Sequence, residues 1–325
     1  EDERQGGGPA DAEAFGDGPY PTAVFITGSG PQDRDETLMG HKPFLVVADH
    51  LARNGVASLR CDDRGVGAST GSFDDATSFD FADDVRAQID FLQGNQTVGT
   101  VGLIGHSEGG LIAPMVAADS DAVDWLVLLA APGVPGSEIL REQIKAIFRA
   151  EGLNDEPALE GMVRAQQASF DAMRAGDREA GILAVTELMR LQNNATGMPN
   201  EPGRLAQAAE DYHASIDTPW FRAFLTLDPR DALRRTTQPV LVLNGTLDTQ
   251  VLHDQNVPAI EHALEEAGND DVTVHVLGGL NHLFQPAETG AVSEYGLIAT
   301  TFDEATLDII ASWIRNRGDS GDAPR

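Results

Sequence analysis

Short apolar segments alternate with amphipathic segments along most of the chain. Six apolar segments, each five or six residues long and most of them ended by turn residues, have the length and composition of buried strands. They lie at 22–27, 56–61, 101–105, 125–130, 239–243 and 272–277. Apolar side chains recur at the spacing of one helical face in residues 42–53 and 79–92, and residues 109–118 and 303–316 are also expected to be helical. This alternation predicts an α/β fold with a mostly parallel sheet and helices on both faces.

Residues 135–235 interrupt the alternation. They are rich in residues that favour helices, such as Glu, Ala, Leu and Met, and contain no convincing strand. A helical insertion after the fourth strand would cover the carboxyl edge of the sheet. We therefore predict a helical cap at 135–235 and a core at 1–134 and 236–325. The alternative is a segment that packs on the flank of the core.

Charged residues make the chain strongly acidic, with 52 Asp and Glu against 22 Lys and Arg and a net charge of −30. Such a surface repels phosphate backbones and anionic lipid headgroups, so it argues against nucleic acid and membrane-surface partners. The charge is either a solvated acidic coat or a halophilic adaptation, in which salt screens the self-repulsion. Stability that fell as salt rose to molar concentration would exclude the second interpretation.

No apolar run approaches the ~20 residues of a membrane-spanning helix. No charged segment followed by an apolar one opens the sequence, so no signal peptide is visible. Residue 1 is Glu, which leaves a removed leader open, and secreted, periplasmic and cytoplasmic locations all stay open. The single cysteine, Cys61, excludes an internal disulfide and a cysteine-rich zinc site, and we expect a buried, inert thiol.

The strongest chemical signal is the G-x-S-x-G motif at residues 105–109, between a predicted strand and a predicted helix. This spacing suits a nucleophilic serine, Ser107, because flanking glycines permit a sharp strand-to-helix turn. The helix N-terminus also offers N–H groups to a developing oxyanion. An N-cap serine is the alternative. His106, beside Ser107, is expected to be a structural hydrogen-bonding residue.

A serine nucleophile needs a histidine to take its proton and a carboxylate to orient that histidine. Asp248 follows the strand 239–243 through a turn, which would lift its carboxylate at the strand's carboxyl end. His282 lies in the loop after the strand 272–277, where an imidazole could reach both partners. His253 and His262 are expected on the surface, and the histidines lack the spacing of a metal site.

The oxyanion would need two backbone donors. One is the N–H of Glu108, directly after the nucleophile, and the other is the N–H of Ser29, in the turn after the first strand. The alternative for Ser29 is an ordinary glycine turn. Trp220 and Phe221, at the end of the predicted cap, either line the substrate pocket or pack in a core.

The chain resembles bacterial α/β-hydrolases of the esterase and serine-aminopeptidase-like group. The matching segments are Gly28-Ser-Gly-Pro-Gln-Asp-Arg-Asp-Glu36, Asp62-Asp-Arg-Gly-Val-Gly67 with Ser69, Gly105-His-Ser-Glu-Gly-Gly110, Asn244-Gly-Thr-Leu-Asp248 and Gly279-Leu-Asn-His-Leu-Phe-Gln285. The resemblance implies the α/β-hydrolase fold, carboxylesterase activity without metal or cofactor, and a triad of Ser107, Asp248 and His282. Together these segments predict a serine esterase that acts on small-molecule esters of short to medium acyl chain, and an oligomer stays open.

Three other functions stay open. An acyl-CoA thioesterase and an aminopeptidase or amidase would use the same triad, although the net charge weighs against the phosphates of CoA. An inactive hydrolase-fold binding protein is the alternative outside enzymes.

The N-terminal segment departs from the pattern of the resembled group. Members of the resembled group begin with an antiparallel hairpin, but residues 1–21 are too rich in Gly and Asp to form one readily. The hairpin is therefore expected to be missing or supplied by residues outside this sequence.

The run Asp33-Arg34-Asp35 is expected to form local ion pairs that hold the oxyanion loop, with a role in shaping the acyl pocket as the alternative.

Overall fold

Six parallel strands form the centre of the fold, in a computed structural model that describes residues 18–318. The strands are β1 (Tyr20–Ile26), β2 (Ala57–Leu59), β3 (Val98–His106), β4 (Trp125–Leu129), β5 (Val240–Gly245) and β6 (Val272–Leu277). Their order is β2-β1-β3-β4-β5-β6, and every neighbouring pair is parallel. The predicted parallel sheet is confirmed. The question of an N-terminal hairpin falls largely on residues 1–17, outside the described residues.

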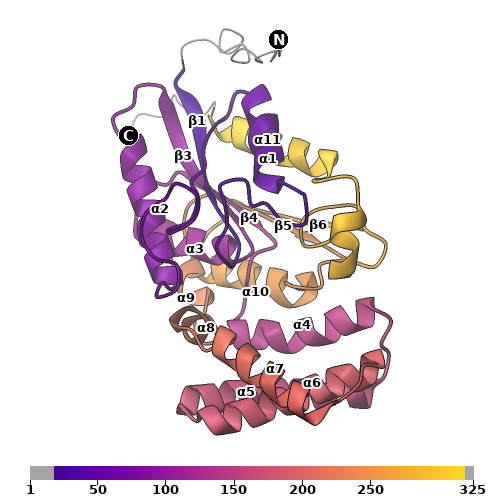
Figure 1. Cartoon of the computed structure of the whole chain (residues 1–325). Coiled ribbons are helices and arrows are strands. Elements are labelled where there is room, and N and C mark those ends of the chain that lie inside the picture. The colour runs from indigo at the N-terminus through magenta and orange to yellow at the C-terminus, as the bar shows by residue number, and fades with distance from the viewer. Residues whose placement is uncertain (1–17, 319–325) are drawn as a thin grey trace, which may run out of the picture.

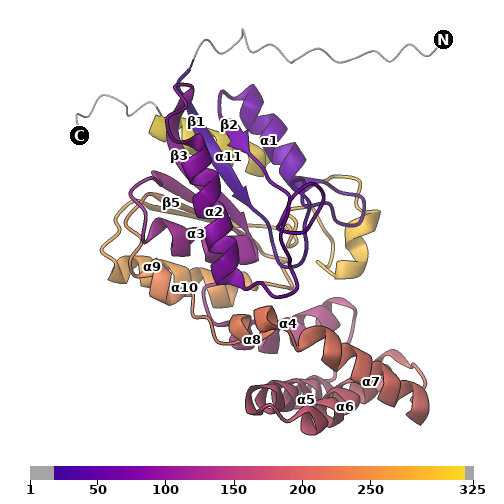
Figure 2. The same cartoon turned by 60° about the vertical axis from the view of Figure 1, so that its left-hand side comes forward.

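Helices cover both faces of the sheet (Figures 1 and 2). Those of the core are α1 (Pro43–Arg53), α2 (Ser78–Leu92), α3 (Glu108–Ala117), α10 (His253–Glu266) and α11 (Glu304–Gly318), and a 3₁₀ helix, η2, spans Val292–Leu297. Because strand side chains alternate, Val24 and Ile26 of β1 pack with α2, α3 and α10. Ala23 and Phe25 pack on the opposite face with α1 and α11. The result is two apolar layers, one on each side of the sheet.

The edge strand β2 is shorter than the predicted segment 56–61. Only Ala57–Leu59 pairs with β1, which is its single neighbour in the sheet. The next residue, Arg60, forms an ion pair with Asp35 in the loop after β1. The apolar pattern along the chain could not reveal this charge pair directly after the strand.

Six helices lie between β4 and β5, where the sequence predicted helices and no strand. They are α4 (Gly136–Ala150), α5 (Glu156–Ala175), α6 (Arg178–Thr196), α7 (Pro202–Ile216), α8 (Pro219–Phe224) and α9 (Arg230–Leu233). Helices α4 to α7 gather at one end of the molecule, away from the sheet (Figures 1 and 2). Within residues 18–318, no helix has the length and apolar character that crossing a membrane requires.

Candidate active site

Ser107 lies on the turn between β3 and α3 in a strained backbone conformation. Its φ is +52°, in the left-handed region that residues with a Cβ rarely adopt. The turn requires its glycines, since a Cβ on Gly105 would lie 2.1 Å from the carbonyl oxygen of Gly109. A Cβ on Gly109 would lie equally close, 2.1 Å, to the carbonyl oxygen of Ile26. The structure therefore confirms the sharp strand–turn–helix setting that the sequence predicted for Ser107.

Asp248 and His282 form a buried pair. Nδ1 of His282 lies 2.9 Å from Oδ2 of Asp248. A carboxylate only accepts, so Nδ1 carries the hydrogen and Nε2 is left to accept a proton. The N–H groups of Gln250 and Val251 donate to Oδ1 of Asp248 at 2.8 and 2.9 Å, and the amide of Asn244 donates to Oδ2 at 3.1 Å. These donors hold the carboxylate in one orientation toward the imidazole.

Ser107 and His282 line one cavity of about 240 Å³, called here the smaller cavity. Ser29 and Glu108, the two expected oxyanion donors, line it as well. The inserted helices supply an apolar wall, made of Ile139, Leu140, Trp220, Phe221 and Phe224. Six of the seven site residues that the sequence singled out therefore meet at this cavity, and the seventh, Asp248, is hydrogen-bonded to His282.

The loop after β1 is held by its charged residues. Asp33 accepts hydrogen bonds from the N–H groups of Asp35 and Thr37, both at 3.0 Å. Arg34 pairs with Asp62 at 2.8 Å, and Asp35 pairs with Lys42 at 3.1 Å. The predicted local ion pairs of the run 33–35 are confirmed. The Arg34–Asp62 pair connects the loop that carries Ser29 to the segment after β2.

Glu108 has a buried side chain whose role the sequence did not reveal. Oε1 accepts hydrogen bonds from the hydroxyl of Ser78 at 2.6 Å and from the indole N–H of Trp220 at 2.7 Å. Burial raises the pKa of this carboxyl, and hydrogen bonds, including one with Ser29, oppose that shift. Glu108 thus joins α2, the loop after β1 and the inserted helix α8. The only signal in the sequence was its place after Ser107.

His106 is buried and hydrogen-bonded on both sides, which confirms its expected structural role. Nδ1 lies 2.9 Å from Oε1 of Glu36, and Nε2 lies 2.9 Å from the carbonyl oxygen of His282. The sequence did not identify Glu36 as a partner, because seventy positions separate the two residues.

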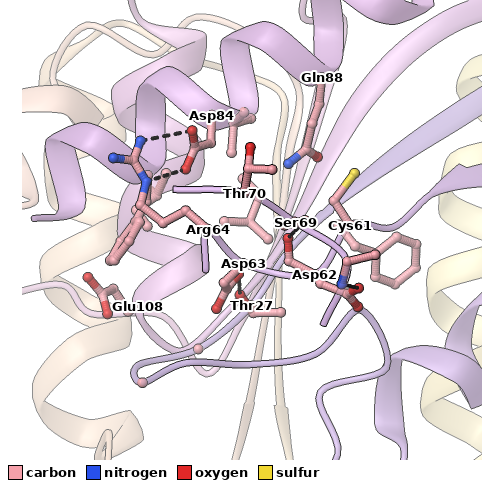
Figure 3. A pocket seen from close by; sticks show the side chains of 18 residues that line it. Thr27, Cys61, Asp62, Asp63, Arg64, Ser69, Thr70, Asp84, Gln88 and Glu108 are labelled. Atoms are coloured by element: carbon pink, nitrogen blue, oxygen red, sulfur yellow. Dashed lines mark hydrogen bonds and ion pairs between the residues drawn. The ribbon is translucent and has the colours of Figure 1, made fainter. Parts of the chain in front are cut away.

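A second, larger cavity has a volume of about 430 Å³ (Figure 3). It shares Gly28 and Glu108 with the smaller one. Its charged side chains interact with one another or with nearby donors. Arg64 pairs with Asp84 at 2.8 Å, as the dashed lines in Figure 3 show. Asp63 accepts from the hydroxyl of Thr27 at 2.8 Å, and burial raises its pKa to about 6.

Cys61 also lines the larger cavity, so its thiol is only partly buried. Burial raises the pKa of this thiol, which disfavours the reactive thiolate. His262 is exposed and His253 partly buried, both on α10. Among residues 18–318, no three His, Cys, Asp or Glu side chains are arranged to hold a metal ion.

Comparison with known families and proteins gives a consistent result. The family model described as Hydrolase_4, serine aminopeptidase S33, matches residues 42–288, a range that contains Ser107, Asp248 and His282. The esterase EstD of Thermotoga maritima is 26% identical over 300 residues. That match covers 92% of this chain and 63% of EstD, so the chain spans less than two thirds of the length of this relative.

Solved structures with similar folds include two hydrolases. The esterase Pf2001 of Pyrococcus furiosus is 14% identical, with 91% of this chain and 83% of that chain covered and a TM-score of 0.53. The α/β hydrolase GrgF of Penicillium sp. sh18 is 14% identical, with 93% and 91% covered and a TM-score of 0.55. At these identities the likeness concerns the fold, and the predicted α/β-hydrolase fold is confirmed.

Proposed function

Because the chain belongs to the serine aminopeptidase S33 (Hydrolase_4) family, we propose that it is a serine carboxylesterase that acts through an acyl-enzyme on Ser107. One observation carries the proposal. Ser107, strained at φ +52°, and His282, held at 2.9 Å by Asp248, line the same cavity. The 26% identity to an esterase of Thermotoga maritima supports ester hydrolysis over other acyl transfers.

In the first step Ser107 attacks the ester carbonyl. Nε2 of His282 takes the proton of the hydroxyl as Oγ forms a bond to the carbonyl carbon. The imidazolium then gives this proton to the leaving alcohol, and the acyl group stays on Ser107. Asp248 stabilises the charged imidazole and keeps Nε2 directed toward the serine.

Water completes the cycle. His282 takes a proton from a water molecule, whose oxygen attacks the acyl-enzyme, and Ser107 leaves with that proton. In both steps the carbonyl oxygen becomes negative, and the N–H groups of Ser29 and Glu108 donate to it. Both residues line the cavity beside Ser107, which supports this assignment.

The inserted helices act as a cap over the site. Residues from α4 and α8, among them Trp220 and Phe221, form the apolar wall of the smaller cavity and would contact the substrate's carbon groups. A volume of about 240 Å³ lies below the ~300 to 1,000 Å³ of drug-sized ligand pockets. This size supports substrates of short to medium acyl chain.

An aminopeptidase is the second candidate. The description of the family supports it, and so does the buried carboxylate of Glu108, which lines the cavity and could attract a substrate ammonium group. A rate panel separates the candidates: aryl esters from short to long acyl chains, an aminoacyl anilide and an acyl-CoA. We expect the highest kcat/KM for short aryl esters.

The direct test is Ser107→Ala together with a serine-directed phosphonate probe. Loss of the nucleophile should lower kcat by on the order of 10⁴- to 10⁶-fold. Mass spectrometry should find the phosphonate on Ser107 of the unmodified protein and no label on the variant. Ser120→Ala, just beyond the far end of α3, is the matched control and should keep both activity and label. Near-full esterase activity in Ser107→Ala would end the proposal.

A further inference from the structure

The proposed mechanism leaves one buried pair unused, Glu36 and His106. Glu36 is 4% exposed and His106 is 5% exposed. Glu36 comes from the loop after β1, and His106 is the last residue of β3, directly before Ser107. Two groups that carry charge are thus buried beside the site, which is costly unless each is well paired.

Oε1 of Glu36 has two partners. It accepts the N–H of Gly28 at 2.7 Å and lies 2.9 Å from Nδ1 of His106. Gly28 directly precedes Ser29, the expected oxyanion donor, and a Cβ on Gly28 would lie 3.2 Å from Cβ of Ser107. Glu36 therefore holds the oxyanion loop where it meets the nucleophile.

The second ring nitrogen of His106, Nε2, contacts the backbone of His282, the proposed base. Nε2 lies 2.9 Å from the backbone carbonyl of His282, and the two imidazole rings are 4.8 Å apart between centroids. A carbonyl only accepts, so Nε2 of His106 carries a hydrogen, and the Glu36 carboxylate likewise only accepts, so Nδ1 carries one as well. The chain Gly28–Glu36–His106–His282 therefore connects the oxyanion loop to the backbone of the base through three hydrogen bonds.

The loop that carries Glu36 is built to present it. Glu36 has φ +53°, a strained value for a residue with a side chain, and its N–H donates to the carbonyl of Asp33 at 2.9 Å. Asp33 and Arg34 in turn fix the loop through Thr37 and Asp62. Backbone strain held in place by surrounding contacts is typical of functional sites.

We propose that Glu36 and His106 are positioning residues, which act as one buried bridge to keep the oxyanion donors and His282 in register around the substrate carbonyl. The inference rests on the proposed esterase function. Neither residue touches the reacting atoms. Their contribution is geometric, because a displacement of about 1 Å in a catalytic group can cost on the order of 10²-fold in rate.

Electrostatic interactions favour the charged imidazole of His106, which can donate to both of its partners. Burial alone would lower the pKa of His106, but the Glu36 carboxylate and the His282 carbonyl raise it. The charged or titratable groups that act on this imidazole are Glu36, Asp248 and His282. Without the Glu36 charge the neutral imidazole is favoured, and an amide at position 36 could not then hydrogen-bond both to its Nδ1 and to the N–H of Gly28. If its NH₂ donated to Nδ1, Gly28 would lose its acceptor, and if its oxygen stayed on Gly28, two lone pairs would face each other.

The test compares Glu36→Gln, His106→Asn and the double variant on a short aryl ester. Each single change should lower kcat by on the order of 10²-fold and leave KM within about threefold. The double variant should fall no more than about threefold further, because the two residues form one bridge. Thermal unfolding of each variant checks that it is folded.

His41→Asn is the matched control. His41 is also buried and bridges Thr301 and the carbonyl of Tyr295 at 2.9 and 3.0 Å, but it does not line the smaller cavity. It should lose comparable stability and keep kcat within about threefold. A control that loses as much kcat as His106→Asn would overturn the inference, and so would folded Glu36→Gln with near-normal kcat or fully multiplicative effects in the double variant.

A measurement on the unmodified protein covers the case in which a variant fails to fold. Imidazole nitrogen NMR should show His106 with a hydrogen on both Nδ1 and Nε2. A free Nδ1 would contradict the bridge. If the unmodified protein hydrolyses no ester, the proposed function fails instead, and the NMR result still decides whether the bridge exists.

Discussion

The two cavities that share Gly28 and Glu108 differ in volume, in the pairing of their charged groups and in the reactive side chains that line them. The larger, at about 430 Å³, is rich in charged groups, but each of these has a partner, either a second charge, as Arg64 and Asp84 do in Figure 3, or a nearby hydrogen-bond donor, as Asp63 does. The smaller, at about 240 Å³, has a serine on a strained turn and a histidine whose Nε2 is left to accept a proton. Volume and charge therefore say less about reactivity than the presence of a group that the fold leaves unsatisfied.

The cavities also differ in their walls. Residues of α4 and α8 line the smaller cavity, whereas every residue that lines the larger one comes from outside the inserted helices. Of these two cavities, only the smaller is therefore lined by the inserted helices that we propose act as a cap. Two carboxylates that line the larger cavity contact the loop that carries Ser29: Asp62 pairs with Arg34, and Asp63 accepts the N–H of Gln32 at 2.9 Å.

The largest expected difference is in kcat, between one substitution beside the smaller cavity and one beside the larger cavity. Asp248→Asn should lower kcat by roughly 10⁴-fold, because an amide favours the wrong tautomer of His282. Asp84→Asn, at the larger cavity, breaks a partly exposed ion pair and should change kcat by less than about threefold. Steady-state kinetics on an aryl ester measure both. A loss of similar size in Asp84→Asn would give the larger cavity a part in the reaction.

The next-largest effect is on the free energy of unfolding, which should depend on pH through Asp63. Its pKa is raised from 3.8 to about 6, so the folded state binds more protons than the unfolded state between these values. Stability from this group is therefore present at low pH and is lost as pH rises from about 4 to about 6. The loss amounts to about 3 kcal/mol at most. Asp63→Asn should remove this dependence, so the variant should gain stability relative to the unmodified protein as pH rises.

Urea unfolding at intervals from pH 4 to pH 7 measures this difference. Asp62→Asn is the control, because Arg34 holds the pKa of Asp62 well below its usual range and its protonation does not change in this window. A stability difference between Asp63→Asn and the unmodified protein that is the same at every pH would show that Asp63 is not buried as described.

The smallest effect concerns the link between the cap and the smaller cavity. Trp220→Phe keeps the aromatic wall but removes the indole N–H that donates to Glu108 at 2.7 Å. A typical hydrogen bond contributes about 0.5–1.5 kcal/mol, and the upper end of this range is a factor of ten, so we expect a rise in KM of up to roughly tenfold as the wall loosens.

Trp313→Phe is the matched control, since its indole donates at 3.1 Å to Thr273, away from both cavities. It should leave KM unchanged. An unchanged KM in Trp220→Phe would separate the cap from substrate binding.

Local patterns were sufficient for much of this site. Ser107, Asp248 and His282 each follow a strand of the parallel sheet, and parallel strands bring their carboxyl ends to one edge, so their meeting was predictable. The roles of Glu36 and Glu108 were not. Glu36 contacts His106 across 70 positions, and Glu108 contacts Trp220 across 112. No periodicity along the chain encodes such pairs, because they arise only when distant loops are folded against each other.

The amino-acid sequence by itself determined the parallel sheet, the strand–turn–helix setting of Ser107 and the helical character of the insertion, because these depend on neighbours a few positions away. The tertiary structure decided where strand β2 ends, which carboxylates are buried and which face of the inserted helices meets the site. Those outcomes depend on burial and charge pairing between segments far apart in the chain. The same distinction separates the residues proposed to carry the reaction from the residues, Glu36 and His106, proposed to hold them in place.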